Sequence, residues 1–341
     1  LPEAIFSDRK NSRGWNINDP QALQKLSGEM APYRDQNWKF GKASLITNPA
    51  NRKEKVGTFK TSSELEAEKA IEKSAKAFKS WSKSTVAERS AILKKTADLY
   101  EANHAELMAI IVREAGKTRL DAIAEIREAV DFLRYYAAEA ASNQAHKPLG
   151  PIVCISPWNF PCAIFTGQIA GALSVGNTVI AKPAEATSLI AARAVELAYA
   201  AGVPQELLQC VPGSGPILGD VICNDARIAG VAFTGSHKTA HKIAMDLAHR
   251  RGPIATFIAE TGGQNAMIVD STVLPEQVVK DVLRSAFGSA GQRCSALRAL
   301  YLQNDIADEV IRLLKGAMNE LVVGNPGDVS TDVGPLISMQ A

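Results

Sequence analysis

The sequence has few cysteines and no long apolar run, and its charges nearly cancel. It contains 5 cysteines in 341 residues and no Cys-x-x-Cys pair, so neither a disulfide framework nor a zinc site is expected. Lys and Arg number 38 against 36 Asp and Glu, which leaves no basic footprint for nucleic acid. No apolar run approaches the roughly 20 residues that cross a bilayer, and no charged leader precedes an apolar core. These absences favour a soluble protein of a reducing cytoplasm.

Residues 1–150 are expected to be mainly helical after a loop-rich beginning. With 341 residues and 46% hydrophobic content, the chain is long enough to bury large cores in two domains. Capping signals predict helices that start after Ser63, Thr85 and Asn103, and Gly116 is expected to end the third. Apolar residues at spacings of three and four predict a fourth helix at 119–141. Short strands are expected at 43–47 and 56–60.

From Pro151 onward, short β-rich runs alternate with helical segments. This alternation predicts an α/β fold with a parallel, doubly wound sheet and helices on both faces. Ligands of such sheets bind at the carboxyl ends of the strands. A second α/β pattern follows residue 260, with strands at 266–270 and 299–303 and helices beginning near Pro275 and Ile306. The strands of the first sheet are expected at 152–156, 178–182, 208–211, 230–233 and 254–259.

One stretch, residues 257–295, carries a carboxylate and a thiol at its two ends. Glu260 follows an apolar run and precedes Thr261 and two glycines, and Cys294 follows Gly-Gln-Arg. Thiolates attack electrophilic carbon and carboxylates activate water, so the pair suits covalent catalysis with hydrolytic release. A lone cysteine is more often a small buried hydrophobe, which is the expectation for the four other cysteines.

Four further motifs follow the expected strands of the first sheet. An Asn amide can donate to a developing oxyanion, Lys and Glu suit ribose hydroxyls, and a helix start with a serine suits a pyrophosphate. Because Glu185 is a good acceptor for ribose hydroxyls and a poor neighbour for a 2′-phosphate, it favours NAD over NADP. The motifs are Ile155-Ser156-Pro157-Trp158-Asn159-Phe160, Lys182 with Glu185, Gly213 with Gly215, and Phe233-Thr234-Gly235-Ser236.

Each of these motifs also has a simpler interpretation. Asn159 could form an Asx turn and Ser236 could be a plain helix N-cap. The glycine spacing that begins at Gly213 departs by one residue from the dinucleotide fingerprint and is weak evidence alone. His237 and His241 stand four apart, but no third ligand accompanies them, so no metal site is expected.

Taken together, the motifs resemble the aldehyde dehydrogenase superfamily over roughly residues 40–341. Glu-Thr-Gly-Gly at 260–263 is similar to the family's general-base motif, and Gly-Gln-Arg-Cys at 291–294 to its nucleophile motif. The run Cys294 to Arg298 is similar to the L-glutamate γ-semialdehyde (pyrroline-5-carboxylate) dehydrogenase branch. The run Phe6 to Asp19 resembles the lead-in to this domain in bacterial bifunctional proline-utilisation proteins.

This resemblance implies an NAD-binding domain preceded by a helical and loop region at 1–259, and the first part of a catalytic thiol domain at 260–341. Cys294 is then the nucleophile and Glu260 the general base, and the Asn159 side chain with the Cys294 backbone N–H forms the oxyanion hole. The implied substrate contacts are Arg293, Ser295 and Phe160. The implied NAD contacts are Ile155, Ser156, Pro157, Trp158, Lys182, Glu185, Gly213, Gly215, Phe233, Thr234, Gly235, Ser236, Thr261 and Gly262.

The implied reaction is the NAD-dependent oxidation of L-glutamate γ-semialdehyde to glutamate, through a thiohemiacetal and a thioester on Cys294. This is the second step of proline catabolism, and the resemblance implies a proline dehydrogenase domain in the same polypeptide.

The sequence departs from the family pattern in two places. Residues 142–151 are shorter than the family's oligomerisation arm, and the later Glu-x-Phe-Gly-Pro motif is missing, so the catalytic domain looks truncated at its C-terminus. A homo-oligomer is expected if the natural protein has the arm.

Three other functions remain open from the sequence. One is another NAD(P)-dependent aldehyde dehydrogenase, such as one acting on succinate semialdehyde. Another is a truncated chain that binds nucleotide without catalysis. The last is a thiol hydrolase that pairs Cys294 with a histidine, although no histidine stands in a recognisable cysteine-protease motif.

Overall fold

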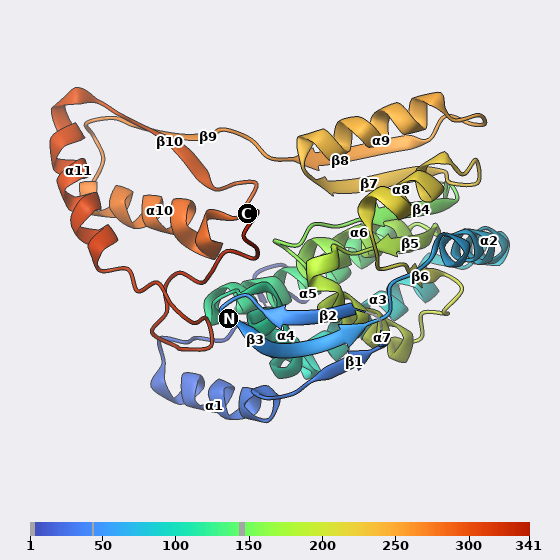
Figure 1. The fold of residues 1–341 in the computed structure, drawn as a ribbon, viewed down its shortest axis with the longest axis horizontal. Helices are drawn as coiled ribbons and strands as arrows, with labels where there is room; N and C mark the ends of the chain where they lie inside the picture. Colours follow the sequence, from blue (N-terminus) through green and yellow to red (C-terminus); the bar gives the residue numbers. More distant parts are fainter. Residues whose placement is uncertain (1–3, 43, 143–146) are drawn as a thin grey trace.

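The computed structural model describes residues 4–42, 44–142 and 147–341 and is built around a five-stranded parallel sheet (Figure 1). The strand order β6-β5-β4-β7-β8 reverses at β4, and ligands bind where the order of such a sheet reverses. All neighbouring pairs are parallel, which confirms the predicted doubly wound sheet. The strands are β4 (Pro151–Ile155), β5 (Thr178–Lys182), β6 (Leu208–Cys210), β7 (Gly230–Gly235) and β8 (Thr256–Thr261).

Helices cover both faces of this sheet because alternate strand residues point to opposite sides. Ile152 and Cys154 belong to one buried core, together with residues of α6 and α7, whereas Val153 belongs to another core with residues of α8 and α9. Both faces are apolar, as expected for a parallel sheet covered by crossover helices. The crossover helices are α6 (Ala163–Ser174), α7 (Ser188–Ala201), α8 (Gly215–Asn224) and α9 (His237–His249).

The four predicted N-terminal helices are present, and their ends follow the predicted signals. Ser63 and Thr85 each form a complete capping box with the glutamate three residues later. Gly116 ends the third helix in the left-handed region, with φ of 68°, which glycine adopts without a Cβ clash. The helices are α2 (Glu64–Trp81), α3 (Val86–Ala102), α4 (His104–Ala115) and α5 (Arg119–Ser142).

The loop-rich beginning contains one helix that was not predicted. Helix α1 (Pro20–Met30) starts at Asp19, whose side chain accepts a hydrogen bond from the Gln21 N–H, and proline occupies its first turn. Both features are start signals of a helix. A short 3₁₀ turn (Ala31–Tyr33) and a three-stranded sheet follow, in which residue 43 of a predicted strand lies outside the described residues. Its strands are β1 (Trp38–Phe40), β2 (Ser44–Asn48) and β3 (Asn51–Phe59).

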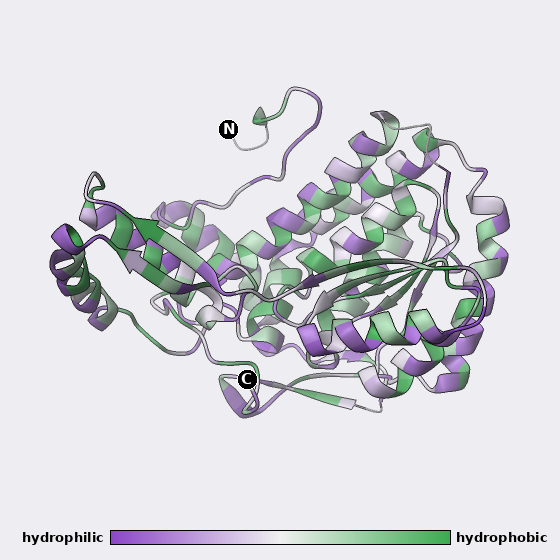
Figure 2. Cartoon of the chain, turned by 90° about the horizontal axis from the view of Figure 1, so that it is seen from above, coloured by the Kyte–Doolittle hydropathy of each residue, from purple (hydrophilic) through white to green (hydrophobic). Residues whose placement is uncertain are grey.

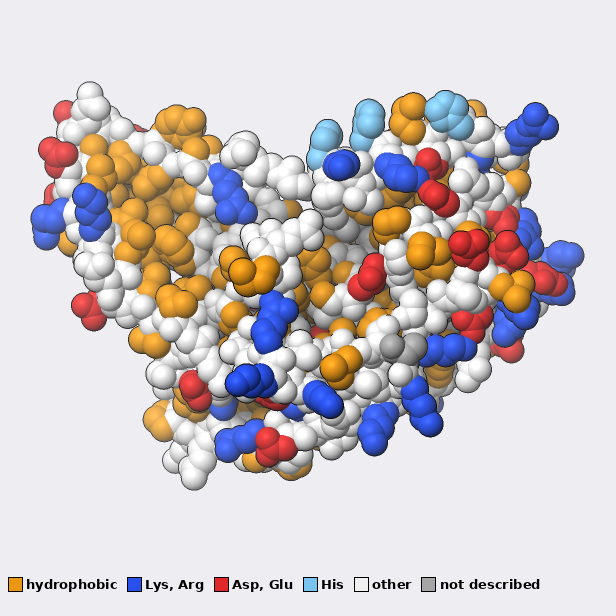
Figure 3. Space-filling model, in the orientation of Figure 1, with side chains coloured by type: hydrophobic (Ala, Val, Ile, Leu, Met, Phe, Trp, Pro, Cys, Tyr) orange, Lys and Arg blue, Asp and Glu red, His pale blue; other side chains and the backbone are white. Residues whose placement is uncertain are grey.

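The C-terminal part forms a smaller α/β unit with its own core (Figure 1). Its two parallel strands are hydrophobic (Figure 2), and Ile268 and Tyr301 are 84% and 61% exposed. Figure 3 shows hydrophobic side chains gathered over this unit. Among the described residues, no helix is both long and apolar enough to cross a bilayer. The elements are β9 (Asn265–Val269), α10 (Pro275–Phe287), β10 (Leu297–Leu302) and α11 (Asn304–Asn319).

A buried carboxylate attaches α4 to the sheet domain and predicts a pH-dependent stability. Glu114 accepts the N–H groups of Leu189 at 2.7 Å and Ile190 at 2.9 Å, at the start of α7. Burial raises the pKa of Glu114 from 4.5 to about 8, and the two N–H donors oppose this rise. A carboxyl group whose pKa is higher in the folded than in the unfolded protein stabilises the fold at pH values below its unfolded-state pKa. This stabilisation is lost as the pH rises through the folded-state pKa.

We therefore expect the free energy of unfolding to fall between pH 4.5 and 8. Because a tenfold change in proton affinity corresponds to about 1.4 kcal/mol, the fall attributable to Glu114 should be on the order of 3–5 kcal/mol. Denaturant titrations of the natural protein and its Glu114→Gln variant across this range measure the difference. If the difference in free energy of unfolding between the two proteins does not change with pH, the pH dependence does not come from Glu114.

Candidate active site

The predicted NAD contacts and the predicted general base lie at the carboxyl ends of the five parallel strands. Ile155 of β4 stands opposite Lys182 of β5 and Phe233 of β7, and Thr234 of β7 stands opposite Glu260 of β8. The turn after β4 and the glycine turn after β6 continue this edge. The structure therefore brings the predicted NAD contacts and the predicted general base to one edge of one sheet.

The thiol and the carboxylate line the same cavity, although they are far apart in the sequence. A cavity of about 600 Å³ is bounded by Cys294, Glu260 and Thr234, together with aromatic residues of α5 and several residues of α6. Both the Cys294 and the Glu260 side chains are exposed to this open space. The arrangement therefore allows an aldehyde and a water molecule to reach both groups.

Cys294 is the exposed one of the five cysteines. Burial raises the pKa of the Cys210 thiol to about 12 and that of Cys223 to about 11. Burial also raises the pKa values of Cys154 and Cys162. These four thiols remain protonated near neutral pH and are poor nucleophiles. Only Cys294 combines solvent access with the predicted motif.

The loop before Cys294 holds an uncommon backbone conformation. Ser289, Ala290 and Gly291 have φ values of 54°, 55° and 69°, a region that costs a non-glycine residue roughly 1–2 kcal/mol. Such outliers persist where surrounding structure fixes them, often at functional sites. Here Arg298 contributes, because its Nη2 donates to the Gly291 carbonyl oxygen at 2.8 Å. Asn265 holds Cys294 itself, because its Nδ2 donates to the carbonyl oxygens of Cys294 at 2.6 Å and Ala296 at 3.0 Å.

The Asn159 amide connects the turn after β4 to the Cys294 loop. Its Nδ2 donates to the Gln292 carbonyl oxygen at 2.8 Å. An amide nitrogen carries two protons, and among the described residues the second has no acceptor. Asn159 is therefore held beside the nucleophile loop with one donor available for an oxyanion.

The strand-end residues fit a dinucleotide. Lys182 is 6% exposed, burial lowers its pKa, and its Nζ donates to the Pro183 carbonyl oxygen at 3.2 Å. An ammonium has three donors, so Lys182 retains capacity for ribose hydroxyls. Glu185 accepts the Gly215 N–H at 3.2 Å, and Ser236 caps the start of α9. The helix N-termini at Gly215 and Ser236, together with the Glu185 acceptor and the Lys182 cation, are the kinds of group that a pyrophosphate and a ribose require.

The three predicted substrate residues differ in placement. Ser295 is exposed beside Cys294, and Phe160 is half-buried. The Arg293 Nη2 donates to the carbonyl oxygens of Arg284 at 2.5 Å and Ser285 at 3.1 Å, near the end of α10. These bonds hold the guanidinium against α10, so its predicted substrate contact stays a prediction.

Two residues with contacts in the site were given no role in the sequence analysis. Gln168 lines the cavity, and its Nε2 donates to the Ile155 carbonyl oxygen at 3.3 Å and to Thr234 Oγ1 at 3.1 Å. It is the one amide side chain in a mostly apolar helix, a signal that could have marked it. Asn265 lies five residues after Glu260, but nothing local indicates that its side chain reaches Cys294.

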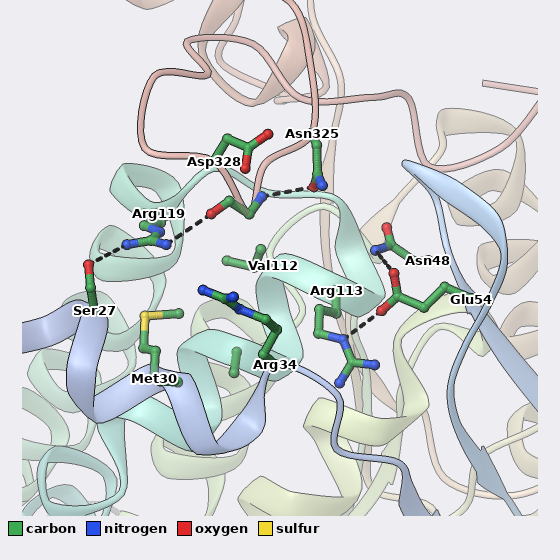
Figure 4. Close-up of a pocket in the computed structure, with 13 residues that line it drawn as sticks. Ser27, Met30, Arg34, Asn48, Glu54, Val112, Arg113, Arg119, Asn325 and Asp328 are labelled. Carbon is green, nitrogen blue, oxygen red and sulfur yellow. Dashed lines mark hydrogen bonds and ion pairs between the residues drawn. The ribbon is translucent and has the colours of Figure 1, made fainter.

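A second cavity, of about 320 Å³, lies between α1, α4 and the loop at 325–328 (Figure 4). Arg119 crosses it, donating to Ser27 Oγ at 2.7 Å and to the Gly327 carbonyl oxygen at 2.9 Å. Arg113 pairs with Glu54 at 2.8 Å. No predicted site residue lines this cavity, and these contacts connect three parts of the fold. The chemistry is therefore assigned to the cavity that Cys294 and Glu260 line.

Comparison with known proteins gives consistent matches. The model of the aldehyde dehydrogenase family matches residues 39–341. The chain is 48% identical to the bifunctional protein PutA of Escherichia coli (strain K12), over 100% of this chain and 27% of that protein. It is 36% identical to the 1-pyrroline-5-carboxylate dehydrogenase of Geobacillus sp. (strain WCH70), over 94% of this chain and 67% of that protein.

A solved structure shares the fold over almost the whole chain. This is the 1-pyrroline-5-carboxylate dehydrogenase from Thermus with bound NAD, with a TM-score of 0.92 and 32% identity, covering 98% of this chain and 71% of that one. The chain spans only 27% of the length of the PutA relative from Escherichia coli.

Proposed function

The chain belongs to the aldehyde dehydrogenase family, and on this premise we propose that it oxidises L-glutamate γ-semialdehyde to glutamate with NAD. The observation that carries the proposal is that Cys294 and Glu260 line one cavity, which runs along β7 and β8 and reaches the carboxyl ends of these strands at Thr234 and Glu260. The names of the relatives, 1-pyrroline-5-carboxylate dehydrogenase among them, support this aldehyde, which forms when the pyrroline ring opens.

Each of the site residues has a defined role in the proposed reaction. The Cys294 Sγ bonds to the aldehyde carbon, and the free N–H of Asn159 donates to the oxygen that gains negative charge. NAD, when bound, supplies the hydride acceptor that turns the Cys294 adduct into a thioester. Glu260 then takes a proton from the water that attacks the thioester carbon, which releases the acid and restores the thiol. Lys182 and Glu185 hold the ribose.

The proposal also concerns the full polypeptide to which this chain belongs. The PutA relatives are named bifunctional proteins, and we propose that the natural polypeptide also carries a proline dehydrogenase domain. Such a domain produces pyrroline-5-carboxylate, which is the precursor of the aldehyde. A reducing cytoplasmic location is proposed from the cysteine content, and a homo-oligomer is proposed for a natural protein that has the family's oligomerisation arm.

Substrate preference tests the proposal. In the natural protein, we expect kcat/KM for NADH formation to be at least about tenfold higher with glutamate semialdehyde than with succinate semialdehyde. The two aldehydes differ by an α-amino group, and a site built to hydrogen-bond such a group rejects the analogue that lacks it. Absorbance of NADH measures both rates. Preference for succinate semialdehyde would contradict the substrate and leave the mechanism intact. No NADH from either aldehyde would contradict the function.

A further inference from the structure

A buried ion pair lies beside both loops that carry the predicted catalytic groups. Lys117 lies in the short link between α4 and α5, and Glu125 lies on α5. Their Nζ and Oε1 atoms are 3.0 Å apart, and their side chains are 6% and 1% exposed. Because desolvation offsets much of the attraction in such a pair, burial alone is weak evidence that it stabilises the fold. The role of the pair therefore depends on the residues that it holds in place.

Glu125 fixes the segment that follows Asn159. Its Oε2 accepts the N–H groups of Cys162 at 3.1 Å and Ala163 at 2.9 Å, where α6 begins. A carboxylate at a helix N-terminus satisfies otherwise unpaired donors and favours the helix dipole. Lys117 Nζ also lies 4.6 Å from the centroid of the Phe160 ring. The pair thus contacts Phe160, which directly follows Asn159, and the backbone N–H groups of Cys162 and Ala163.

Lys117 also reaches the loop that precedes Cys294. Its Nζ donates to Ser289 Oγ at 3.4 Å, and Ser289 is one of the residues with positive φ. The Ser289 carbonyl oxygen accepts the Gln292 N–H at 3.0 Å, and the Gln292 carbonyl oxygen accepts the Asn159 amide at 2.8 Å. The ion pair therefore contacts both the segment after Asn159 and the loop before Cys294, and the bond from Asn159 to Gln292 joins these two loops to each other.

We propose that Lys117 and Glu125 are positioning residues, which set the Asn159 amide against the Cys294 loop and thereby determine how well the oxyanion is stabilised. This inference rests on the proposed function for its kinetic consequence only. Neither side chain belongs to the cavity that Cys294 and Glu260 line, so the pair acts through Asn159 and Ser289. A displacement of about 1 Å at reacting groups can cost about 100-fold in rate.

The test replaces both charges, since removing one would leave the other buried and unpaired. In the natural protein, Lys117→Met with Glu125→Gln should lower kcat by roughly 10- to 100-fold and leave KM for the aldehyde nearly unchanged. In an Asn159→Ala background the same pair of substitutions should cost much less, because the amide that they position is gone. An equal loss in both backgrounds would overturn the proposal.

Hydrogen–deuterium exchange supplies a readout that does not need turnover. Peptides covering 157–163 and 288–295 should both exchange faster in the double variant, whereas a peptide from α11 should not. Unchanged exchange in either loop would overturn the proposal. If the wild-type protein forms no NADH, the proposed function fails, and the exchange result still decides the positioning role.

A matched control is another buried ion pair remote from both loops. Arg134 and Glu101 join α5 to α3 at 2.9 Å, with side chains 4% and 10% exposed. Arg134→Met with Glu101→Gln removes the same kinds of charge from the same helix bundle. It should leave exchange at 157–163 and 288–295 at the wild-type rate. Faster exchange there in this control would show that the effect is general loosening and would overturn the specific role.

Discussion

Replacing Cys294 with serine is expected to lower kcat for NADH formation by roughly 10⁴-fold. A cysteine sulfur is intrinsically a strong nucleophile, whereas a serine hydroxyl needs an adjacent base. The predicted dinucleotide contacts lie at the ends of β4 to β8 and in the turns that follow them, not on the Cys294 loop. NAD affinity of the variant should therefore match that of the wild-type protein. Steady-state kinetics and NAD titration measure the two quantities.

A control separates Cys294 from the other thiols. Cys210 is half-buried at the end of β6, and Cys210→Ser should keep nearly full kcat. Iodoacetamide should label Cys294 first, because burial raises the pKa values of the other four thiols. Activity should fall in proportion to that one label. Substantial turnover by Cys294→Ser, or inactivation that follows labelling of a different cysteine, would remove Cys294 from the mechanism.

The sheet and its ligand edge were predictable because their signals are local. Each strand is a short apolar run that ends at a Pro, Gly or Ser turn, and parallel strands share one carboxyl edge. Asn159, Lys182, Ser236 and Glu260 each follow or end a strand, so their common edge follows from topology alone. Helix starts at Ser63 and Thr85 were predictable for the same reason, since a capping box spans only four residues.

Contacts between distant segments were not predictable in this way. Lys117 and Ser289 are 172 positions apart, and no periodicity or cap encodes their meeting. The same holds for the Asn265 amide against the Cys294 carbonyl oxygen. Nor does the sequence indicate that the Arg293 guanidinium donates to carbonyl oxygens of α10; its substrate contact stays a prediction. Side-chain direction depends on neighbours that only the folded chain supplies.

Replacing Glu260 with glutamine is expected to separate the two halves of the reaction. An amide cannot accept the proton of the attacking water, so thioester hydrolysis should slow by about 10²- to 10⁴-fold. Thioester formation requires Cys294 and Asn159 and should persist. Rapid mixing should therefore show a burst of about one NADH per site followed by slow turnover, which is the signature of an accumulated acyl-enzyme.

The position of Glu260 gives the physical basis for this expectation. It lies on β8 opposite Thr234, and within the described parts of the chain no Lys, Arg or His forms an ion pair with it, so its charge is not committed to a structural contact. Hydroxylamine, a nucleophile that needs no general base, should restore turnover of Glu260→Gln. The matched substitution Glu276→Gln, in the exposed first turn of α10, should change neither the burst nor the steady rate. If Glu260→Gln shows no burst and hydroxylamine has no effect, Glu260 acts before the thioester forms, and its role as the base of hydrolysis is wrong.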